Sequence, residues 1–163
     1  MSYYNQKESI TNKEVIAPKL NALKKLTRNN KLTPRSRSLT TNRYNCWGFT
    51  AFAFKWIKEV EWFEFEEMNY CLQNFTKKVK TPKNGDILVL TGAYSNELIH
   101  TAIIVDAKEK TVLHKVGGLK LEVNTIKGAK KIYDDSSPRI SYHRALPNKK
   151  FKYKEFNQNY QWD

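Results

Sequence analysis

Residues 45–54 have the sequence NCWGFTAFAF, which is unusually apolar. Its aromatic and small residues leave no polar face, so the pattern predicts a helix over residues 46–58 that is buried nearly all round. Asn45 belongs to the residue types that cap helix N-termini, and Cys46 would then open the helix. Gly48 lowers helix propensity, which indicates close backbone packing near the thiol.

The rest of the chain divides into a helical part and a strand-forming part. A second helix is expected over residues 62–75, with Cys71 on its apolar side and in the core. Gly85 and Asp86 are expected to form a turn in which Asp86 bonds backbone amides. Alternating apolar segments then predict strands over residues 87–90, 98–105, 111–116, 119–123 and 139–144. Helices followed by such strands indicate an α+β fold, with N-terminal helices packed on an antiparallel sheet of about five strands.

The chain length of 163 residues suits one folded domain with short extensions. We expect a basic N-terminal extension with a short helix over residues 1–43, the α+β domain over residues 44–146, and a basic aromatic tail over residues 147–163. The rings of this tail either dock on the domain or stack on bases or sugars. Docking is the simpler expectation.

The formal net charge of +13 predicts attraction to polyanions such as nucleic acid, teichoic acid, lipopolysaccharide or an anionic membrane surface. The N-terminus lacks the apolar core of a secretory signal, and no run approaches the ~20 apolar residues of a membrane span. We therefore expect a protein that is cytoplasmic as made, with delivery by a phage or a secretion system left open. The two cysteines form no CxxC pair, and we expect no metal, no cofactor and no disulfide.

The most informative chemical pair is Cys46 at a helix start and His100 at a strand start. The unpaired N–H groups and dipole of a helix N-terminus lower a thiol pKa and favour the nucleophilic thiolate. An imidazole partner takes the thiol proton and later returns it to the leaving group. We therefore expect the sulfur of Cys46 and the ring of His100 to meet within proton-transfer distance.

A third polar residue is expected on a neighbouring strand. If residues 107–110 form a hairpin tip, Asp106 pairs with Thr111 and His114 comes close to His100. His114 would then hydrogen-bond the far nitrogen of His100 and fix its tautomer. Glu122 and His143 are the alternatives for this orienting role, because each could reach from a neighbouring strand.

The ordered set of NCWGFT at 45–50, NGDIL at 84–88, HTAIIV at 100–105 and then His114 resembles the NlpC-type papain-like cysteine peptidases and their CHAP relatives. The resemblance covers roughly residues 44–116. It implies a papain-like domain in which a helix-borne Cys packs on an antiparallel sheet, and hydrolysis of amide bonds in peptidoglycan peptides. Trp47 stands where the family usually has a small residue, and Thr101-Ala102 replaces its Val-Gly. These departures bear on the expected substrate class more than on the expected fold.

These observations lead to the hypothesis of a thiol hydrolase of peptidoglycan peptides. Cys46 is the nucleophile and supplies a backbone oxyanion donor, His100 is the base and acid, and His114 orients His100. Asn45 and Trp47 are the candidate substrate-binding residues. Candidate partners are peptidoglycan or an anionic envelope polymer, nucleic acid and an immunity protein. The alternative is a non-catalytic papain-like or basic phage or host-control protein that binds nucleic acid or another polyanion. Deamidation or acyl transfer on a protein target is a third reading of the same residues.

Overall fold

The computed structural model describes residues 44–58, 61–116 and 121–159. The short helix expected within residues 1–43 lies outside these ranges, as does the end of the C-terminal tail. The described part begins with helices α3 (Cys46–Ala53) and α4 (Phe65–Phe75). None of the described helices is both long and apolar enough to cross a membrane.

A six-stranded antiparallel sheet follows, in the order β1-β6-β2-β3-β4-β5. This confirms the α+β class, although the sheet has one strand more than expected because β1 continues directly from the end of α4. A short helix α5 (Ile126–Ile132), a 3-10 turn and the helix α6 (Tyr153–Asn159) were not predicted. The strands are β1 (Thr76–Val79), β2 (Ile87–Thr91), β3 (Leu98–Asp106), β4 (Thr111–Lys115), β5 (Leu121–Thr125) and β6 (Arg139–Ala145).

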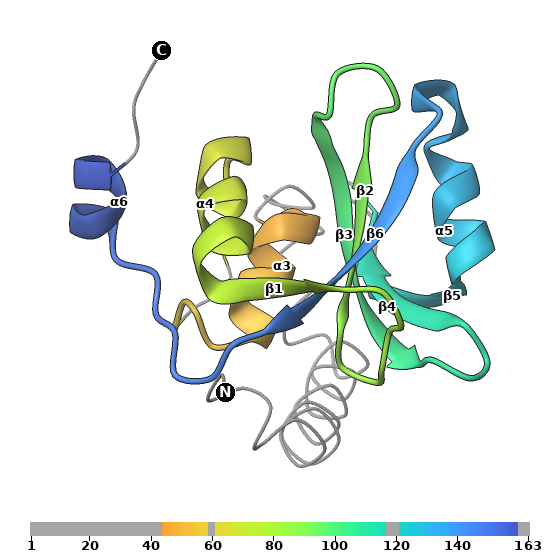
Figure 1. Cartoon of the computed structure of the whole chain (residues 1–163), viewed down its shortest axis with the longest axis horizontal. Helices are drawn as coiled ribbons and strands as arrows, with labels where there is room; N and C mark the ends of the chain where they lie inside the picture. Colours follow the sequence, from red (N-terminus) through yellow and green to blue (C-terminus); the bar gives the residue numbers. More distant parts are fainter. Residues whose placement is uncertain (1–43, 59–60, 117–120, 160–163) are drawn as a thin grey trace, which may run out of the picture.

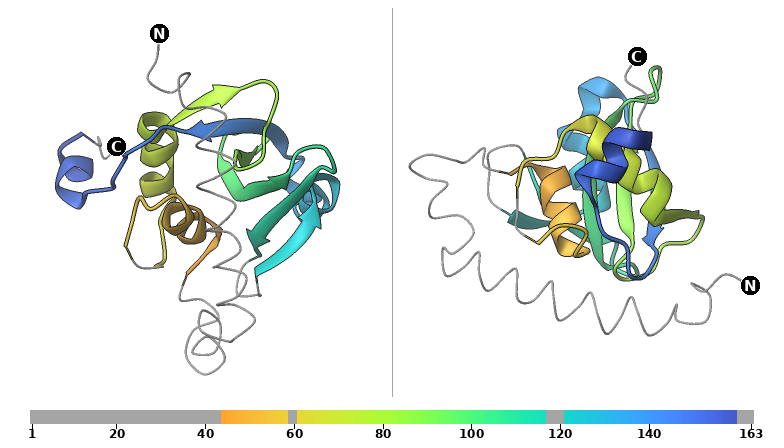
Figure 2. Two further views of the ribbon diagram at one scale, coloured as in Figure 1. Left: turned by 90° about the horizontal axis from the view of Figure 1, so that it is seen from below. Right: turned by 90° about the vertical axis from the view of Figure 1, so that its left-hand side faces the viewer.

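Helices cover both faces of the sheet (Figures 1 and 2). Helices α3 and α4 lie on one face, where Ile103 and Leu113 pack with Phe49 of α3. Helix α5 lies on the other face, where Ala102, Ile104 and Val112 pack with its apolar residues. From His100 to Ile104, successive residues of β3 therefore point to opposite layers, which places His100 on the α5 side and Thr101 on the α3 side.

Helix α3 begins as expected and ends earlier. The side chain of Asn45 accepts a hydrogen bond from Gly48 N at 2.8 Å, which caps the helix and confirms its start. A Cβ on Gly48 would lie 1.7 Å from the carbonyl oxygen of Glu61, so the close backbone packing is also confirmed. The helix ends at Ala53 rather than at residue 58, because Lys55 adopts the left-handed conformation, with φ at 58°.

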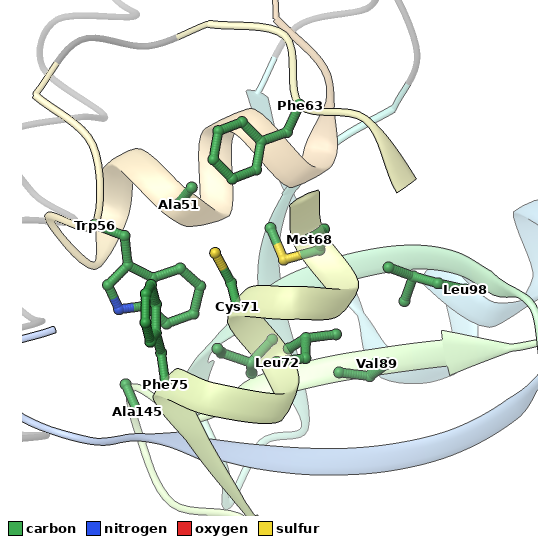
Figure 3. Packing of buried hydrophobic residues seen from close by; sticks show 11 residues of the cluster. Ala51, Trp56, Phe63, Met68, Cys71, Leu72, Phe75, Val89, Leu98 and Ala145 are labelled. Carbon is green, nitrogen blue, oxygen red and sulfur yellow. The ribbon is translucent and has the colours of Figure 1, made fainter. Parts of the chain in front are cut away.

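The main core lies between α4 and the sheet (Figure 3). Cys71 is fully buried there, as predicted, and points from α4 toward the α3 layer. The aromatic tail also docks as expected, since the rings of Phe151 and Phe156 contact that of Tyr70 with centroids 6.0 and 5.5 Å away. The tail rings of this described segment are therefore part of the packing.

The turn before β2 is held by a buried ion pair. Gly85 has a positive φ of 91°, and Asp86 accepts a hydrogen bond from Lys83 N at 2.7 Å, which confirms the turn. The fully buried carboxylate of Asp86 also accepts two hydrogen bonds from Arg144 of β6, at 2.8 and 2.7 Å. This bidentate pair ties the turn to β6, and the sequence gives no local signal for it.

Candidate functional site

Three side chains from neighbouring strands form a hydrogen-bonded line. His100 Nε2 lies 3.0 Å from His114 Nδ1, and His114 Nε2 lies 3.0 Å from Glu122 Oε1. The hairpin pairing of Asp106 with Thr111 produces this approach, as the spacing predicts. Both rings are fully buried, whereas the Glu122 side chain is half exposed.

A fourth side chain extends this line at its other end. The hydroxyl of Tyr133, just after α5, lies 3.0 Å from His100 Nδ1, and the two rings are tilted with centroids 4.7 Å apart. Sequence reasoning missed Tyr133 because the short, lysine-rich α5 has too few apolar residues to be recognised. We call Tyr133, His100, His114 and Glu122 the relay.

The carboxylate of Glu122 sets the direction of the relay. A carboxylate only accepts, so His114 Nε2 carries the proton and His114 Nδ1 accepts from His100 Nε2–H. The lone pair of His100 is then on Nδ1, where it accepts the Tyr133 O–H. This assignment follows from the hydrogen-bond network and makes Nδ1 the basic atom of His100.

Cys46 lies beside this relay without bonding to it directly. Its carbonyl accepts hydrogen bonds from the hydroxyls of Thr50 at 2.9 Å and Thr101 at 3.4 Å, and Thr101 follows His100 on β3. The backbone pairing of β3 with β4 ends at Ile103 and Leu113, so His100 and His114 lie beyond the last paired residues.

The expected contact between the Cys46 thiol and His100 is not made. His100 shares the face of Ala102 and Ile104, under α5, whereas α3 packs on the opposite face. Among the described residues the partners of the His100 ring are Tyr133 and His114, one on each nitrogen. Tyr133 therefore links Cys46 to His100. Burial raises the pKa of Tyr133 most, and a charge on Cys46 is close enough to raise it further.

The pKa values of the thiol and the imidazole make both groups neutral at pH 7. Burial raises the pKa of Cys46 to about 11, although the backbone amides of Thr101, Trp47 and Cys46 and the charge of Lys115 act in the opposite direction. The expected lowering of the thiol pKa is therefore wrong, because desolvation outweighs the helix N-terminus. Burial has the largest effect on His100 and the charge of a protonated His114 the next; together they lower the pKa of His100 to about 3.

Lys115 is a second residue that sequence reasoning missed. It is 1% exposed, and its ammonium lies 4.7 Å from the centroid of the Tyr44 ring. Burial lowers the pKa of Lys115, whereas the nearby Cys46 raises it. A buried cation beside a thiol would stabilise a thiolate or an oxyanion formed there. The signal in the sequence is a lysine directly after His114 on a largely buried strand.

The two candidate substrate-binding residues occupy different environments. The side-chain amide of Asn45 bonds Gly48 N and both backbone groups of Phe63, at 2.7 to 3.3 Å, so its capacity is used in holding the start of α3. Trp47 is half-buried, its ring makes a T-shaped contact with that of Phe65, and its Nε1 has no hydrogen-bond partner among the described residues. A substrate-binding role remains a prediction for both residues.

The alternatives for the orienting residue are now separated in space. Glu122 completes the relay through His114, whereas His143 lies on β6 and bonds Thr76 Oγ1 at 2.8 Å. Within the described ranges no three His, Cys, Asp or Glu side chains are grouped so that they could hold a metal ion.

Comparisons with protein-family models, with curated proteins and with solved structures give no match for this chain.

Proposed function

We propose that the protein is a thiol hydrolase of amide bonds, with Cys46 as nucleophile and His100 as the acceptor of its proton. The observation that carries the proposal is the relay next to the start of α3. One end of the relay, the Tyr133 hydroxyl, lies within electrostatic reach of Cys46, and the other end is the carboxylate of Glu122.

Tyr133 passes the proton in this mechanism. Its oxygen accepts the thiol proton of Cys46 while its own proton moves to His100 Nδ1, so Tyr133 stays neutral. Burial raises its pKa above the ordinary range, and it therefore keeps its proton between turnovers. His114 and Glu122 then share the positive charge formed on His100, as the third member of a catalytic triad does.

The covalent steps balance without any further reagent. The sulfur of Cys46 bonds the amide carbon as the C=O double bond opens to an oxyanion. His100 returns the proton to the amine, the C–N bond breaks, and a thioester remains on Cys46. Water then bonds the thioester carbon and gives a proton to His100 along the same path. The C–S bond breaks, the acid is released and the proton returns to the sulfur of Cys46.

Oxyanion stabilisation comes from donors around the sulfur. The backbone amides of Cys46 and Trp47 face the thiol closely enough to lower its pKa, and the Lys115 charge acts in the same sense. Donors arranged in a buried site in this way stabilise a tetrahedral intermediate. Because the resting thiol is neutral, we place the proton transfer in the attack step itself.

The proposed substrate is a peptide of peptidoglycan. This rests on the resemblance to NlpC-type and CHAP peptidases, whose papain-like arrangement we propose for residues 44–116. A helix-borne Cys, a His on β3 and a polar residue on β4 support that arrangement. The net charge of +13 would hold the enzyme near anionic envelope polymers.

The test is incubation of purified muropeptides with the wild type, Cys46→Ala and the matched control Cys71→Ala, with products identified by mass spectrometry. We expect product from the wild type and the control and none from Cys46→Ala. Equal product from Cys46→Ala, with the fold verified by circular dichroism, would exclude Cys46 as nucleophile.

A further inference from the structure

A second site lies away from the relay, beside α4. It is a pocket with a volume of about 640 Å³ between α4 and residues of β1, β2, β3 and β6. Its floor includes Leu72, Val89 and Leu98, which lie close together in Figure 3. None of the relay residues, and neither cysteine, lines it. The volume is typical of a site for a small organic ligand.

His143 presents one ring nitrogen to this pocket. The Thr76 hydroxyl donates its single proton to the carbonyl of Leu72, so it must accept from His143 Nδ1–H. Nε2 is then the lone-pair nitrogen, and it has no hydrogen-bond partner among the described residues. Among the described residues, the polar side-chain atoms that are both fully buried and without a hydrogen-bond partner are Tyr44 Oη and Trp47 Nε1. His143 Nε2 is not one of them, so it is not fully buried. His143 Nε2 is therefore open to the pocket that this residue lines.

The ring of His143 is neutral near physiological pH. Burial, followed by the charge of Lys78, lowers its pKa to about 4. Its Nε2 consequently acts as a hydrogen-bond acceptor, and a ligand at this position must supply an N–H or O–H group. A fixed acceptor above an aliphatic floor favours a ligand that is both polar and apolar.

Cationic side chains stand at the rim. Lys78 makes no ion pair with a described residue. The guanidinium of Arg139 is oriented by hydrogen bonds from Nη2 to Gly92 O at 3.3 Å and to the side chain of Asn96. Its Nε and Nη1 atoms have no hydrogen-bond partner among the described residues. None of the described residues that line the pocket is acidic, so its charge favours an anionic group.

We propose that this pocket binds the C-terminal residue of a short apolar peptide. The carboxylate pairs with the ammonium of Lys78, which lies opposite His143 in the sheet, and the amide N–H of the same residue donates to His143 Nε2. Its side chain covers Leu72, Val89 and Leu98, and Arg139 adds positive charge farther along β6. A peptide C-terminus carries these three features on adjacent atoms. A sugar phosphate has the charge and a donor but no apolar group for the floor. The proposal is independent of the proposed hydrolase function.

The experiment is titration of the full chain with N-acetyl-Ala-Val, followed by NMR chemical-shift changes. We expect shifts at Ser141 and His143, about a tenfold weaker affinity for Lys78→Gln, and a smaller loss of about threefold for Arg139→Gln, whose charge acts from farther away. Lys108→Gln, at an exposed lysine outside the pocket, serves as the control and should bind like the wild type. Cys46→Ala should also bind normally, which separates this result from the fate of the hydrolase proposal.

Two further titrations identify the ligand chemistry. The C-terminal amide of the same peptide should not bind, because it lacks the carboxylate. Inorganic phosphate and a short single-stranded oligonucleotide should leave the pocket signals unchanged. Equal binding of the amide, binding of phosphate or the oligonucleotide in place of the peptide, or no shifts with millimolar peptide would each overturn the proposal.

Discussion

Two buried imidazoles, His100 and His143, occupy opposite situations in one sheet. His100 has both nitrogens bonded, to Tyr133 and His114, within a line that ends at a carboxylate. His143 has one nitrogen bonded to Thr76 and the other open to a pocket. Burial lowers the pKa of both, so depressed basicity alone does not distinguish a catalytic histidine from a binding one. Their partners do: only the His100 relay offers a path for a proton.

The largest difference in turnover is expected between the variants that lack the imidazole of His100 and of His143. His100→Ala should lower the turnover of muropeptides by about 10³-fold, because the base and its relay are lost. His143→Ala should leave turnover within about threefold of the wild type. The measurement is kcat by product quantification, with the melting temperature of each variant as the control for folding. Similar losses in both variants would remove the distinction between the two sites.

Tyr133→Phe should produce the next largest effect, a loss of about 10²-fold in kcat, since the proton of Cys46 then has no carrier to His100. The ring packing of Tyr133 on His100 is kept in this variant. Tyr142→Phe, at a half-buried tyrosine on β6, is the matched control and should be unchanged. A higher kcat for Tyr133→Phe would instead show that the hydroxyl blocks Nδ1.

Glu122→Gln should reduce kcat by about tenfold or less. Its carboxylate ends the relay, but the side chain is half exposed and water screens its charge. Gln can still accept from His114, so KM should stay constant while the pH at which kcat is half-maximal falls. The pH profile of kcat makes this measurement. A changed KM with an unchanged profile would assign Glu122 to substrate binding.

The smallest effect concerns stability in acid. The folded pKa values of His100 and His143, about 3 and about 4, lie below the ordinary value of 6.5. The unfolded chain therefore binds more protons, and these two groups destabilise the fold as pH falls below about 6.5. Each contributes a slope of at most about 1.4 kcal/mol per pH unit. Urea unfolding from pH 7 to 4.5 should show a shallower slope for His143→Gln than for the wild type. An equal slope would contradict the buried neutral ring.

The parts of the site that the sequence predicts are those built from local patterns. The Asn45 cap, the packing at Gly48 and the approach of His114 to His100 follow from residue type, alternation and the length of one hairpin. Tyr133 does not, because it depends on a seven-residue helix that folds back on the sheet only in the complete domain. Lys115 likewise owes its position to long-range packing.

The pKa of the Cys46 thiol shows why the chemical state of the site could not be predicted from the sequence. The start of a helix favours a thiolate, and the sequence locates that start correctly. The cost of burying the charge depends on everything packed around Cys46, including residues more than fifty positions away such as Thr101. Burial dominates, and the resting thiol is neutral. Long-range packing also decides the strand count, because the short strand β1 exists through its pairing with β6. The α+β class could therefore be predicted, whereas the number of strands could not.

The most direct test of the central claim is acylation of the protein by a short-peptide nitrophenyl ester, followed by intact-mass and peptide-mass spectrometry. The account predicts one acyl group on Cys46, formed in the wild type, Cys71→Ala and His143→Ala, absent in Cys46→Ala and at least about tenfold slower in His100→Ala. Acylation of Cys71 instead, or of Cys46 at the wild-type rate in His100→Ala, would contradict it.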